Sequence, residues 1–291
     1  MPEIRAGDDI SAIIDSCCKR EQILLENHDV VLVTSKILSK SENNVVDLST
    51  VIPSKKARSI SRLTGKDPIE VEIILSQTRA IRAVIPIKKV MERYPEVFEN
   101  FSTDRESMIR SVNKVPAMLV TVTNQGLVAT DAGLDYSNNP PGKASLLPKN
   151  SDASAKRIRD ELCRLTGKDV SIIITDTEIA FTNFYGSTEV AIGHSGIRPV
   201  SNKFGSKDRF GTEKFGGADV IVDELACAAA LISGQTSESI PIVIVRGLEY
   251  ESDDHMKGKL FQKEAMSIGI GQTILSTLKL RLFSRLLEVF S

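Results

Sequence analysis

The sequence predicts a mixed α/β fold in one large domain or two intimate ones, and three observations support this prediction. Helix-like and strand-like segments alternate along the chain. Several strand-like segments are almost wholly apolar, which is typical of strands covered on both faces. The chain has 291 residues, 41% of them hydrophobic, which is enough to form a large core. A GxxxxGK[ST] motif is absent, so we expect no P-loop. The expected fold is also not a Rossmann fold.

The first part of the chain predicts three helices and one buried strand. Asp8 and Asp9 precede apolar residues at helical spacing, which predicts a capped helix from Ile10 to Cys18. Residues 29–34 predict a strand. Pro53 and Ser54 begin a basic helix that ends at Gly65, and residues 68–80 predict a further helix. Residues 88–116 are charged and polar, and we interpret them as a helical insertion or a mobile lid.

The second part alternates strands and helices again. Residues 118–122 and 127–130 predict a hairpin, because Asn124-Gln125-Gly126 separates two apolar runs. A loop is expected at 136–147. The pattern then predicts helices at 152–165, 218–233 and 274–290, and strands at 170–175, 189–193 and 240–245. The domain prediction is one catalytic unit, 1–291, of two interleaved subdomains, with a C-terminal helical segment at 250–291.

Composition and charge limit the partners. The formal net charge is -1 and the sequence pI is about 6.4, so neither nucleic acid nor a membrane is expected as a partner. The first nine residues do not resemble a secretory signal, and we expect a cytoplasmic protein. The four cysteines have no CxxC spacing, which favours core thiols over a zinc site.

Three acidic positions are candidates for chemistry. Asp135 closes the segment Asp131-Ala132-Gly133-Leu134-Asp135, and Asp176-Thr177 follows a buried strand. A carboxylate beside a hydroxyl at a strand end suits Mg²⁺ or Mn²⁺ near phosphates. Spacing alone fits turn or cap residues as well. Asp223 and Glu224 lie within a predicted helix, and we interpret them as a solvated face.

Anion binding is predicted where the first buried strand ends. Ser35, Lys36, Ser39 and Lys40 follow it, where a helix begins. Hydroxyls, helix-start amides and ammonium groups together suit an anion such as phosphate. The same residues also fit an ordinary helix start with two exposed lysines. Residues 205–217 form a glycine-rich basic loop that either covers a ligand or lies on the surface.

The order of short motifs resembles the coenzyme F420-0:L-glutamate ligase family, also called F420 gamma-glutamyl ligases. The resemblance extends from the N-terminal segment to Val245-Arg246-Gly247-Leu248. The motifs that carry it are Pro2-Glu3-Ile4-Arg5-Ala6-Gly7-Asp8-Asp9, Ser39-Lys40-Ser41-Glu42, Asp131 to Asn138, Leu146-Leu147-Pro148, Asp152-Ala153-Ser154-Ala155, Thr175-Asp176-Thr177 and Val190-Ala191-Ile192-Gly193.

The resemblance implies an activity and its requirements. Members of this family use GTP to add L-glutamate to the lactyl carboxylate of coenzyme F420-0, and they release GDP and phosphate. A second, gamma-linked glutamate is often added. The resemblance also implies two divalent metal sites for Mg²⁺ or Mn²⁺, help from K⁺, an F420 gamma-glutamyl ligase-like fold and a homodimer.

The resemblance assigns roles to particular residues. It implies that Asp135 and Asp176 are metal carboxylates, and that Thr177 and Gln235 complete the second metal site. Lys40 is expected to support the phosphates. The guanine nucleotide contacts that it implies are Met1, Pro2, Glu3, Ile4, Ser35, Lys36, Lys40, Asn138, and, in the loop from Ser233 to Ile240, Gly234, Gln235, Thr236 and Ser237.

The chain departs from the family pattern at two places. The family follows Asp-Thr with a Gly-Arg turn, whereas this chain has Glu178-Ile179-Ala180-Phe181-Thr182-Asn183-Phe184. Residues 88–116 are longer than the family norm. Two alternatives therefore remain: a related metal- and nucleotide-dependent amide ligase with another carboxylate acceptor, and a non-catalytic nucleotide-binding protein.

Overall fold

The chain forms two compact units that alternate along the sequence. The computed structural model describes residues 1–99, 101–180, 186–216, 218–253, 272, 275–279 and 282. Unit 1 comprises Met1–Ser49 and Gly133–Leu260, and unit 2 comprises Thr50–Ala132 and Phe261–Ser291. Both units contain helices and strands, as the predicted mixed α/β class requires.

Unit 1 is built on a mixed sheet with strand order β8-β7-β1-β9. Its strands are β1 (Val30–Thr34), β7 (Ser171–Ile179), β8 (Ser187–Ser195) and β9 (Ile242–Val245). β1 runs parallel to β7, and the other neighbours are antiparallel. The apolar runs of β1 and β7 are buried on both faces, which confirms the prediction and explains why polar residues do not alternate along these strands.

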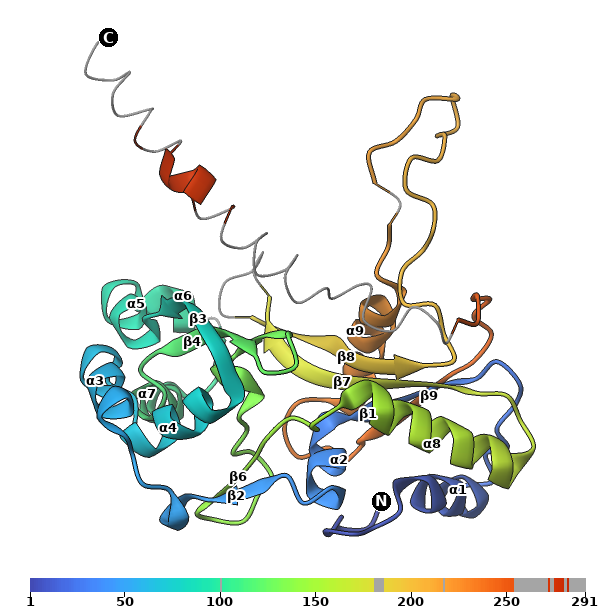
Figure 1. The fold of residues 1–291 in the computed structure, drawn as a ribbon, viewed down its shortest axis with the longest axis horizontal. Helices are drawn as coiled ribbons and strands as arrows, with labels where there is room; N and C mark the ends of the chain where they lie inside the picture. The colour runs from blue at the N-terminus through green and yellow to red at the C-terminus, as the bar shows by residue number, and fades with distance from the viewer. Residues whose placement is uncertain are drawn as a thin grey trace. The chain divides into compact units, whose positions relative to one another are not determined.

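Helices cover both faces of this sheet. α1 (Ile10–Arg20) and α8 (Ser151–Thr166) lie on one face and α9 (Ile221–Ser233) on the other (Figure 1). Successive side chains of a strand point to opposite faces, so Ile172 and Ile174 join the α1–α8 core while Ile173 joins the α9 core. The predicted cap is confirmed, because Asp9 accepts hydrogen bonds from the amides of Ser11 and Ala12.

Glycine is required where α8 approaches β8. A Cβ atom on Gly193 would lie 2.5 Å from the carbonyl carbon and the Cβ of Ser151, the first residue of α8. At the other end of α8, Gly167 adopts a left-handed conformation with φ 68° and ends the helix, as predicted.

The start of α2 (Ser35–Ser41) is placed by the parallel pairing of β1 and β7. Thr34 pairs with Thr175, so the next residues, Ser35 and Asp176, emerge side by side. A short antiparallel ribbon joins β2 (Val45–Asp47) to β6 (Lys143–Ser145) and is followed by the 3-10 helix η1 (Leu48–Thr50). β6 lies inside the segment predicted as loop, so that prediction is wrong for residues 143–145.

Unit 2 combines helices with an antiparallel sheet of order β3-β4-β5. The predicted hairpin is confirmed as β4–β5, and the predicted basic helix is confirmed as α3, which ends at Gly65. The elements are α3 (Lys55–Thr64), α4 (Pro68–Gln77), β3 (Thr78–Ile85), α5 (Ile87–Arg93), α6 (Pro95–Glu99), α7 (Arg105–Lys114), β4 (Met118–Thr123), β5 (Val128–Thr130) and η2 (Asp131–Gly133).

The structure bears on three further predicted segments. The helix expected at 68–80 ends at Gln77, and the chain continues as strand β3, which the sequence pattern did not predict. α6, α7 and most of α5 lie within residues 88–116, and their role as an insertion or lid stays a prediction. The helix expected at 274–290 lies largely outside the described residues, although 275–279 and 282 are helical.

A buried ion cluster fixes the end of the unit 2 sheet. The side chain of Lys66 is fully buried, and its Nζ lies 2.8 Å from Glu70 Oε1 and 2.9 Å from Asp131 Oδ2. Nζ also donates to the carbonyl of Ala117, and Asp131 Oδ1 accepts from the amide of Leu119. The ammonium charge is therefore matched by anions, as burial requires.

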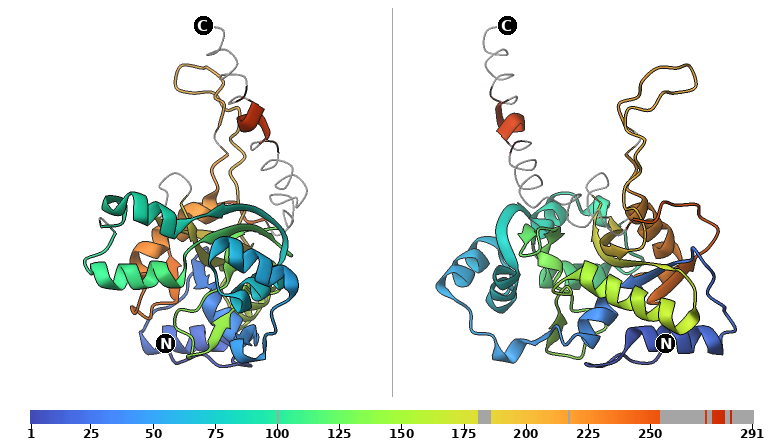
Figure 2. Two further views of the ribbon diagram at one scale, coloured as in Figure 1. Left: turned by 90° about the vertical axis from the view of Figure 1, so that its left-hand side faces the viewer. Right: turned by 45° about the vertical axis from the view of Figure 1, so that its right-hand side comes forward.

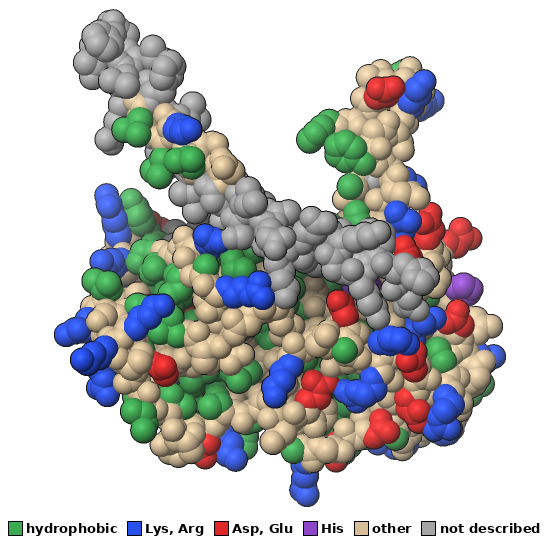
Figure 3. Space-filling model, in the orientation of Figure 1, with side chains coloured by type: hydrophobic (Ala, Val, Ile, Leu, Met, Phe, Trp, Pro, Cys, Tyr) green, Lys and Arg blue, Asp and Glu red, His purple; other side chains and the backbone are tan. Residues whose placement is uncertain are grey.

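An arm at residues 202–216 extends away from the sheet of unit 1 (Figure 2). Its two sides are joined by hydrogen bonds such as that from the Lys214 amide to the Ser206 carbonyl. Phe204, Phe210 and Phe215 are exposed on it, and apolar side chains are visible along it in Figure 3. Within the part of the chain that the structure describes, we find no helix with the length and apolar character to cross a membrane.

Candidate active site

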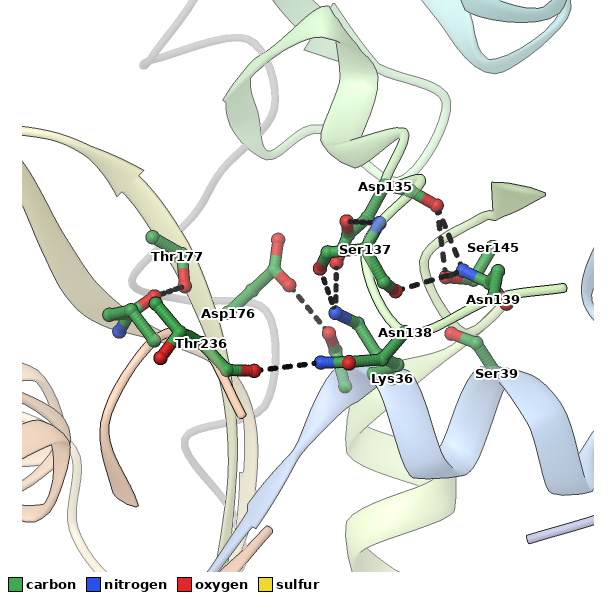
Figure 4. A network of polar contacts seen from close by, with 12 residues as sticks. Lys36, Ser39, Asp135, Ser137, Asn138, Asn139, Ser145, Asp176, Thr177 and Thr236 are labelled. Carbon is green, nitrogen blue, oxygen red and sulfur yellow. Dashed lines mark hydrogen bonds and ion pairs between the residues drawn. The ribbon is translucent and has the colours of Figure 1, made fainter. Parts of the chain in front are cut away.

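Two aspartates from distant segments of unit 1 meet at the start of α2. The hydroxyl of Ser35 donates to Asp176 Oδ1 at 2.5 Å. The adjacent Lys36 forms an ion pair with Asp135, with 2.7 Å between Nζ and Oδ2 (Figure 4). Consecutive residues of one helix therefore contact both carboxylates that the sequence singled out.

The loop that carries Asp135 is held by its own hydrogen bonds. The backbone of Asp135 pairs with that of Ser145, with N···O distances of 3.0 and 2.8 Å. The Ser137 amide donates to Asp135 Oδ1 at 2.7 Å, and Lys36 Nζ donates to the Ser137 hydroxyl. The orientation of this carboxylate is thus fixed from the backbone and from the side chain.

A second group of polar side chains gathers Thr177, Gln235 and Glu189. Thr177 Oγ1 lies 2.8 Å from Gln235 Oε1 and 3.0 Å from Glu189 Oε2, and Gln235 Nε2 donates to the same Glu189 oxygen at 3.1 Å. Thr177 and Glu189 are paired residues of β7 and β8, and Gln235 follows α9. Three elements of unit 1 contribute to this group.

The loop after α9 also reaches Asn138. The side-chain amide of Asn138 donates to the carbonyl of Thr236 at 3.1 Å (Figure 4). The amide of Thr236 in turn donates to Glu238 Oε2 at 2.8 Å. Asn138 itself has φ 52°, a left-handed conformation that asparagine tolerates better than most residues. Two predicted nucleotide contacts are thereby brought together.

Negative charge accumulates around Asp176. Burial raises the pKa of the Asp176 carboxyl well above its ordinary value of 3.8, and the hydrogen bond from Ser35 opposes this shift. The charges of Glu178, Glu189 and Asp135 raise the same pKa further. Such a concentration of carboxylates favours a bound cation.

The remaining predicted nucleotide contacts form a separate group near the N-terminus. Lys40 Nζ lies 2.6 Å from Glu3 Oε1, and it is on the same face of α2 as Lys36, four residues earlier. Pro2 is exposed, whereas the side chain of Ile4 is buried in the α1–α8 core. No hydrogen bond among the described residues connects Lys40 to Asp135 or Asp176.

The donor set consists of oxygens that suit hard cations. Asp135 and Asp176 offer carboxylates, Thr177 a hydroxyl and Gln235 an amide oxygen, and Mg²⁺ and Mn²⁺ prefer such ligands. The described residues contain no group of three or more His, Cys, Asp or Glu side chains arranged around one metal position. Phosphate oxygens or water would have to complete the coordination of a cation here.

Sequence reasoning missed Glu189 and misplaced two other residues. Glu189 was seen only as the start of a strand; its position opposite Thr177 follows from the β7–β8 register. Asp223 was assigned to a solvated face, but it accepts the Ala191 amide at 2.8 Å and burial raises its pKa. Cys227 was assigned to the core, but it is exposed.

Comparison with known proteins gives consistent matches. The family described as F420-0:Gamma-glutamyl ligase matches residues 1–247. A coenzyme F420:L-glutamate ligase of Methanosarcina mazei is 37% identical over 271 residues, which cover 92% of this chain and 91% of that protein. The enzyme of the same name from Methanothermobacter thermautotrophicus is 32% identical, covering 91% of this chain and 94% of the relative. That from Methanocaldococcus jannaschii is 35% identical over 78% of each chain.

The fold, the gathered polar residues and these matches define the class of protein, which is a ligase. The matches extend over nearly the whole described chain and over the segments that form the site. The chain belongs to the F420-0:gamma-glutamyl ligase family.

Proposed function

We propose that this protein is a GTP-dependent ligase that adds L-glutamate to coenzyme F420-0, with later glutamates gamma-linked. The observation that carries the proposal is the meeting of Asp135 and Asp176 at Ser35 and Lys36, in a chain of this family. The proposed substrates are GTP, F420-0 and L-glutamate. The natural setting that we propose is the cytoplasm.

Divalent cations fit the site on the chemistry of its donors. We propose that Asp135 and Asp176 hold one Mg²⁺ or Mn²⁺, and that Asp176, Thr177 and Gln235 hold a second. K⁺ is proposed as a further activating cation. When bound, these ions spread the negative charge of the triphosphate during phosphoryl transfer.

The chain's own residues have complementary tasks in the proposed reaction. Lys36 and Lys40 support phosphate groups, and Asn138 with the loop from Gly234 to Ser237 holds the nucleotide. Pro2, Glu3, Ile4 and Ser35 complete the proposed nucleotide contacts. Ile4 can contribute only its backbone, because its side chain lies in the core.

The proposed chemistry proceeds through an acyl phosphate. A carboxylate oxygen of F420-0 attacks the γ-phosphorus of GTP, and GDP leaves. The unprotonated amine of glutamate then attacks the acyl carbon, phosphate leaves, and the new amide loses one proton. Positioning and charge stabilisation are the main tasks of the protein in such a transfer.

Mass spectrometry of the product tests this proposal. Purified protein is incubated with F420-0, GTP, glutamate and Mn²⁺, and the expected product is heavier than F420-0 by one or more glutamyl units. GDP and phosphate should appear in step with each amide bond. The absence of any glutamylated product, with GTP still bound and hydrolysed, would reject F420-0 as the acceptor.

The segment after Thr177 motivates a second candidate function. Glu178 stands where the family has glycine, and it is buried beside the candidate site. Residues 181–185 lie outside the described residues. An enzyme that uses a different carboxylate acceptor would retain the nucleotide and cation sites and would differ in this segment. Phosphate release that requires glutamate and another carboxylate, but not F420-0, would support that candidate.

We also propose that the protein is a homodimer. The arm at 202–216 exposes three phenylalanines, and α9 exposes Leu231 and Ile232 in the same unit. Burying a phenylalanine side chain is favourable by about 2 kcal/mol. A second copy of the chain would supply the surface that these side chains need.

A further inference from the structure

We infer that Glu189 is a positioning residue that orients Thr177 and Gln235 toward the second cation. This inference rests on the proposed function, because it concerns the cation site assigned there. The family resemblance gave no role to Glu189, and no hydrogen bond joins it to Asp135 or Asp176 among the described residues.

The first support is the geometry of one carboxylate oxygen. Glu189 Oε2 lies 3.0 Å from Thr177 Oγ1 and 3.1 Å from Gln235 Nε2. Thr177 Oγ1 and Gln235 Oε1 are themselves 2.8 Å apart. Three polar groups from β7, β8 and the loop after α9 therefore surround one point, and Glu189 is the anion among them.

The second support is which of these groups can donate a hydrogen bond and which can only accept one. An ionised carboxylate only accepts hydrogen bonds, so it must face the NH₂ group of Gln235 and not its carbonyl. The amide oxygen of Gln235 is then directed at Thr177. With a neutral residue in place of Glu189, the side-chain amide of Gln235 could flip and exchange the positions of its oxygen and its NH₂ group.

The same reasoning fixes the hydroxyl of Thr177. This hydroxyl has one proton, and two acceptors lie within reach, Glu189 Oε2 and Gln235 Oε1. When the oxygens of Thr177 and Gln235 coordinate a cation, the hydroxyl proton of Thr177 points to Glu189. Both oxygens then present lone pairs to the cation, and neither is blocked by a hydrogen.

Burial shows that this arrangement has a cost. Glu189 is only 6% exposed, and the donors that reach its carboxylate among the described residues are neutral. An anion in such a position is unfavourable in isolation. A divalent cation held by Thr177 and Gln235 would supply the opposing charge, so Glu189 also contributes electrostatic attraction to that site.

The test compares Glu189→Gln with the wild type by direct measurement of cation binding. Electron paramagnetic resonance of free Mn²⁺ gives the number and affinity of sites on the full chain in the presence of GTP. We expect two Mn²⁺ per chain in the wild type. In Glu189→Gln we expect one of the two sites to lose affinity by roughly 10- to 100-fold, as for other residues that orient metal ligands. The other site should be unchanged.

Asp223→Ala is the control, because alanine removes the oxygen that accepts the Ala191 amide. Asp223 links α9 to β8 through the Ala191 amide, so its loss loosens the same packing without touching Thr177 or Gln235. The midpoint temperature of thermal unfolding, measured without metal, should fall in the control, while both Mn²⁺ affinities stay at the wild-type value. Equal loss of Mn²⁺ affinity in both variants would reduce Glu189 to a packing role and overturn the inference.

Two further results would also decide the matter. Two unaltered Mn²⁺ sites in Glu189→Gln, or a wild-type protein that binds a single Mn²⁺ with GTP, would overturn the role of Glu189. A failure to glutamylate F420-0 with both Mn²⁺ sites intact counts only against the proposed acceptor. The two failures are thereby distinguished.

Discussion

Lys36 and Asp135 form an ion pair with 2.7 Å between Nζ and Oδ2, and Ser35, the neighbour of Lys36, donates to Asp176. The ammonium group of Lys36 therefore neutralises one of the two aspartates proposed as metal ligands. A divalent cation that binds Asp135 must compete with this ammonium group. The phosphates of GTP offer Lys36 another anionic partner, so binding of cation and nucleotide should be coupled.

Replacing Lys36 by glutamine tests this coupling. Without the ammonium group, Asp135 loses its ion-pair partner, and we expect Mn²⁺ alone to bind several-fold more tightly, by up to about fivefold for a partly exposed ion pair. The KM for GTP should rise by roughly tenfold, because a phosphate contact is lost. Mn²⁺ titration without nucleotide and steady-state kinetics measure the two effects separately.

The control for this variant is Lys156→Gln. Lys156 is paired with Asp160 on the surface of α8, so the control removes the same charge from an ion pair that involves no site residue. It should leave both quantities unchanged. Weaker Mn²⁺ binding in Lys36→Gln would contradict the competition that we describe.

The charge of Asp176 should be essential for turnover. In Asp176→Asn, the amide oxygen still accepts the hydrogen bond from Ser35, so the fold is expected to persist. The lost charge should lower kcat by at least about 100-fold, a typical effect for an electrostatic contributor. Product formation at saturating GTP measures the loss, and circular dichroism checks the fold. Wild-type kcat in this variant would exclude Asp176 as a metal ligand.

Lys40 offers a test of the N-terminal group. Its ammonium pairs with Glu3, and both are proposed to lie near the nucleotide. Lys40→Ala should raise the KM for GTP by about tenfold and leave the KM for the acceptor within about twofold. Initial rates with one substrate varied at a time separate the two constants. An unaltered GTP requirement would remove Lys40 from the nucleotide site.

Much of the unit 1 fold was predictable because its signals are local. Each signal lies within a few residues of the sequence: the apolar runs of β1 and β7, the cap at Asp9 and the left-handed Gly167. β3 was missed because register shifts between Thr78 and Ala80 and between Ile81 and Ala83 disturb its period of two. β2 and β6 have three residues each, too few to produce a period.

The sequence singled out residues of the candidate site one by one but did not predict their arrangement. Asp135 and Asp176 stood out individually because each follows a strand or turn. Their meeting depends on the parallel register of Thr34 with Thr175, which no local pattern encodes. Glu189 was missed for the same reason, since its role arises from the strand opposite. An acidic residue near the start of the strand that follows an Asp-Thr strand is the signal that would have suggested it.

Glu70 predicts a pH dependence of stability in unit 2. Burial raises its pKa above 4.5, although Lys66, 2.8 Å away, acts in the opposite direction. The folded state therefore holds this proton more tightly than the unfolded state. The contribution of Glu70 to the free energy of unfolding falls as pH rises from about 4.5 through the raised pKa. Glu70→Gln should remove this part of the slope in urea denaturation.

Glu72→Gln, in the same helix, is the control with the opposite sign. Hydrogen bonds from Ser54 lower the pKa of Glu72, so its contribution is present above pH 4.5 and is lost as pH falls through the lowered value. The difference in the free energy of unfolding between wild type and Glu70→Gln should thus grow as pH rises above 4.5, whereas the difference between wild type and Glu72→Gln should shrink as pH falls below it. The same pH profile in both variants would contradict the role of burial at Glu70.

The arm provides the test of the proposed homodimer. Phe210 and Phe215 are 89% and 97% exposed, so changing both to serine removes little packing within the chain besides the edge-to-face contact of Phe215 with Phe204. If a second copy covers them, four phenylalanines leave the interface of a dimer of the double variant, which loses roughly 8 kcal/mol of association free energy, about a millionfold in the dimer dissociation constant. Sedimentation velocity should show a dimer for the wild type and a monomer for the variant at micromolar concentration. Arg209→Ala, also on the arm, should leave the dimer intact, because this change removes a charge and keeps the exposed phenylalanines. A wild-type monomer, or a double variant that remains fully dimeric, would show that the arm phenylalanines do not hold two copies together.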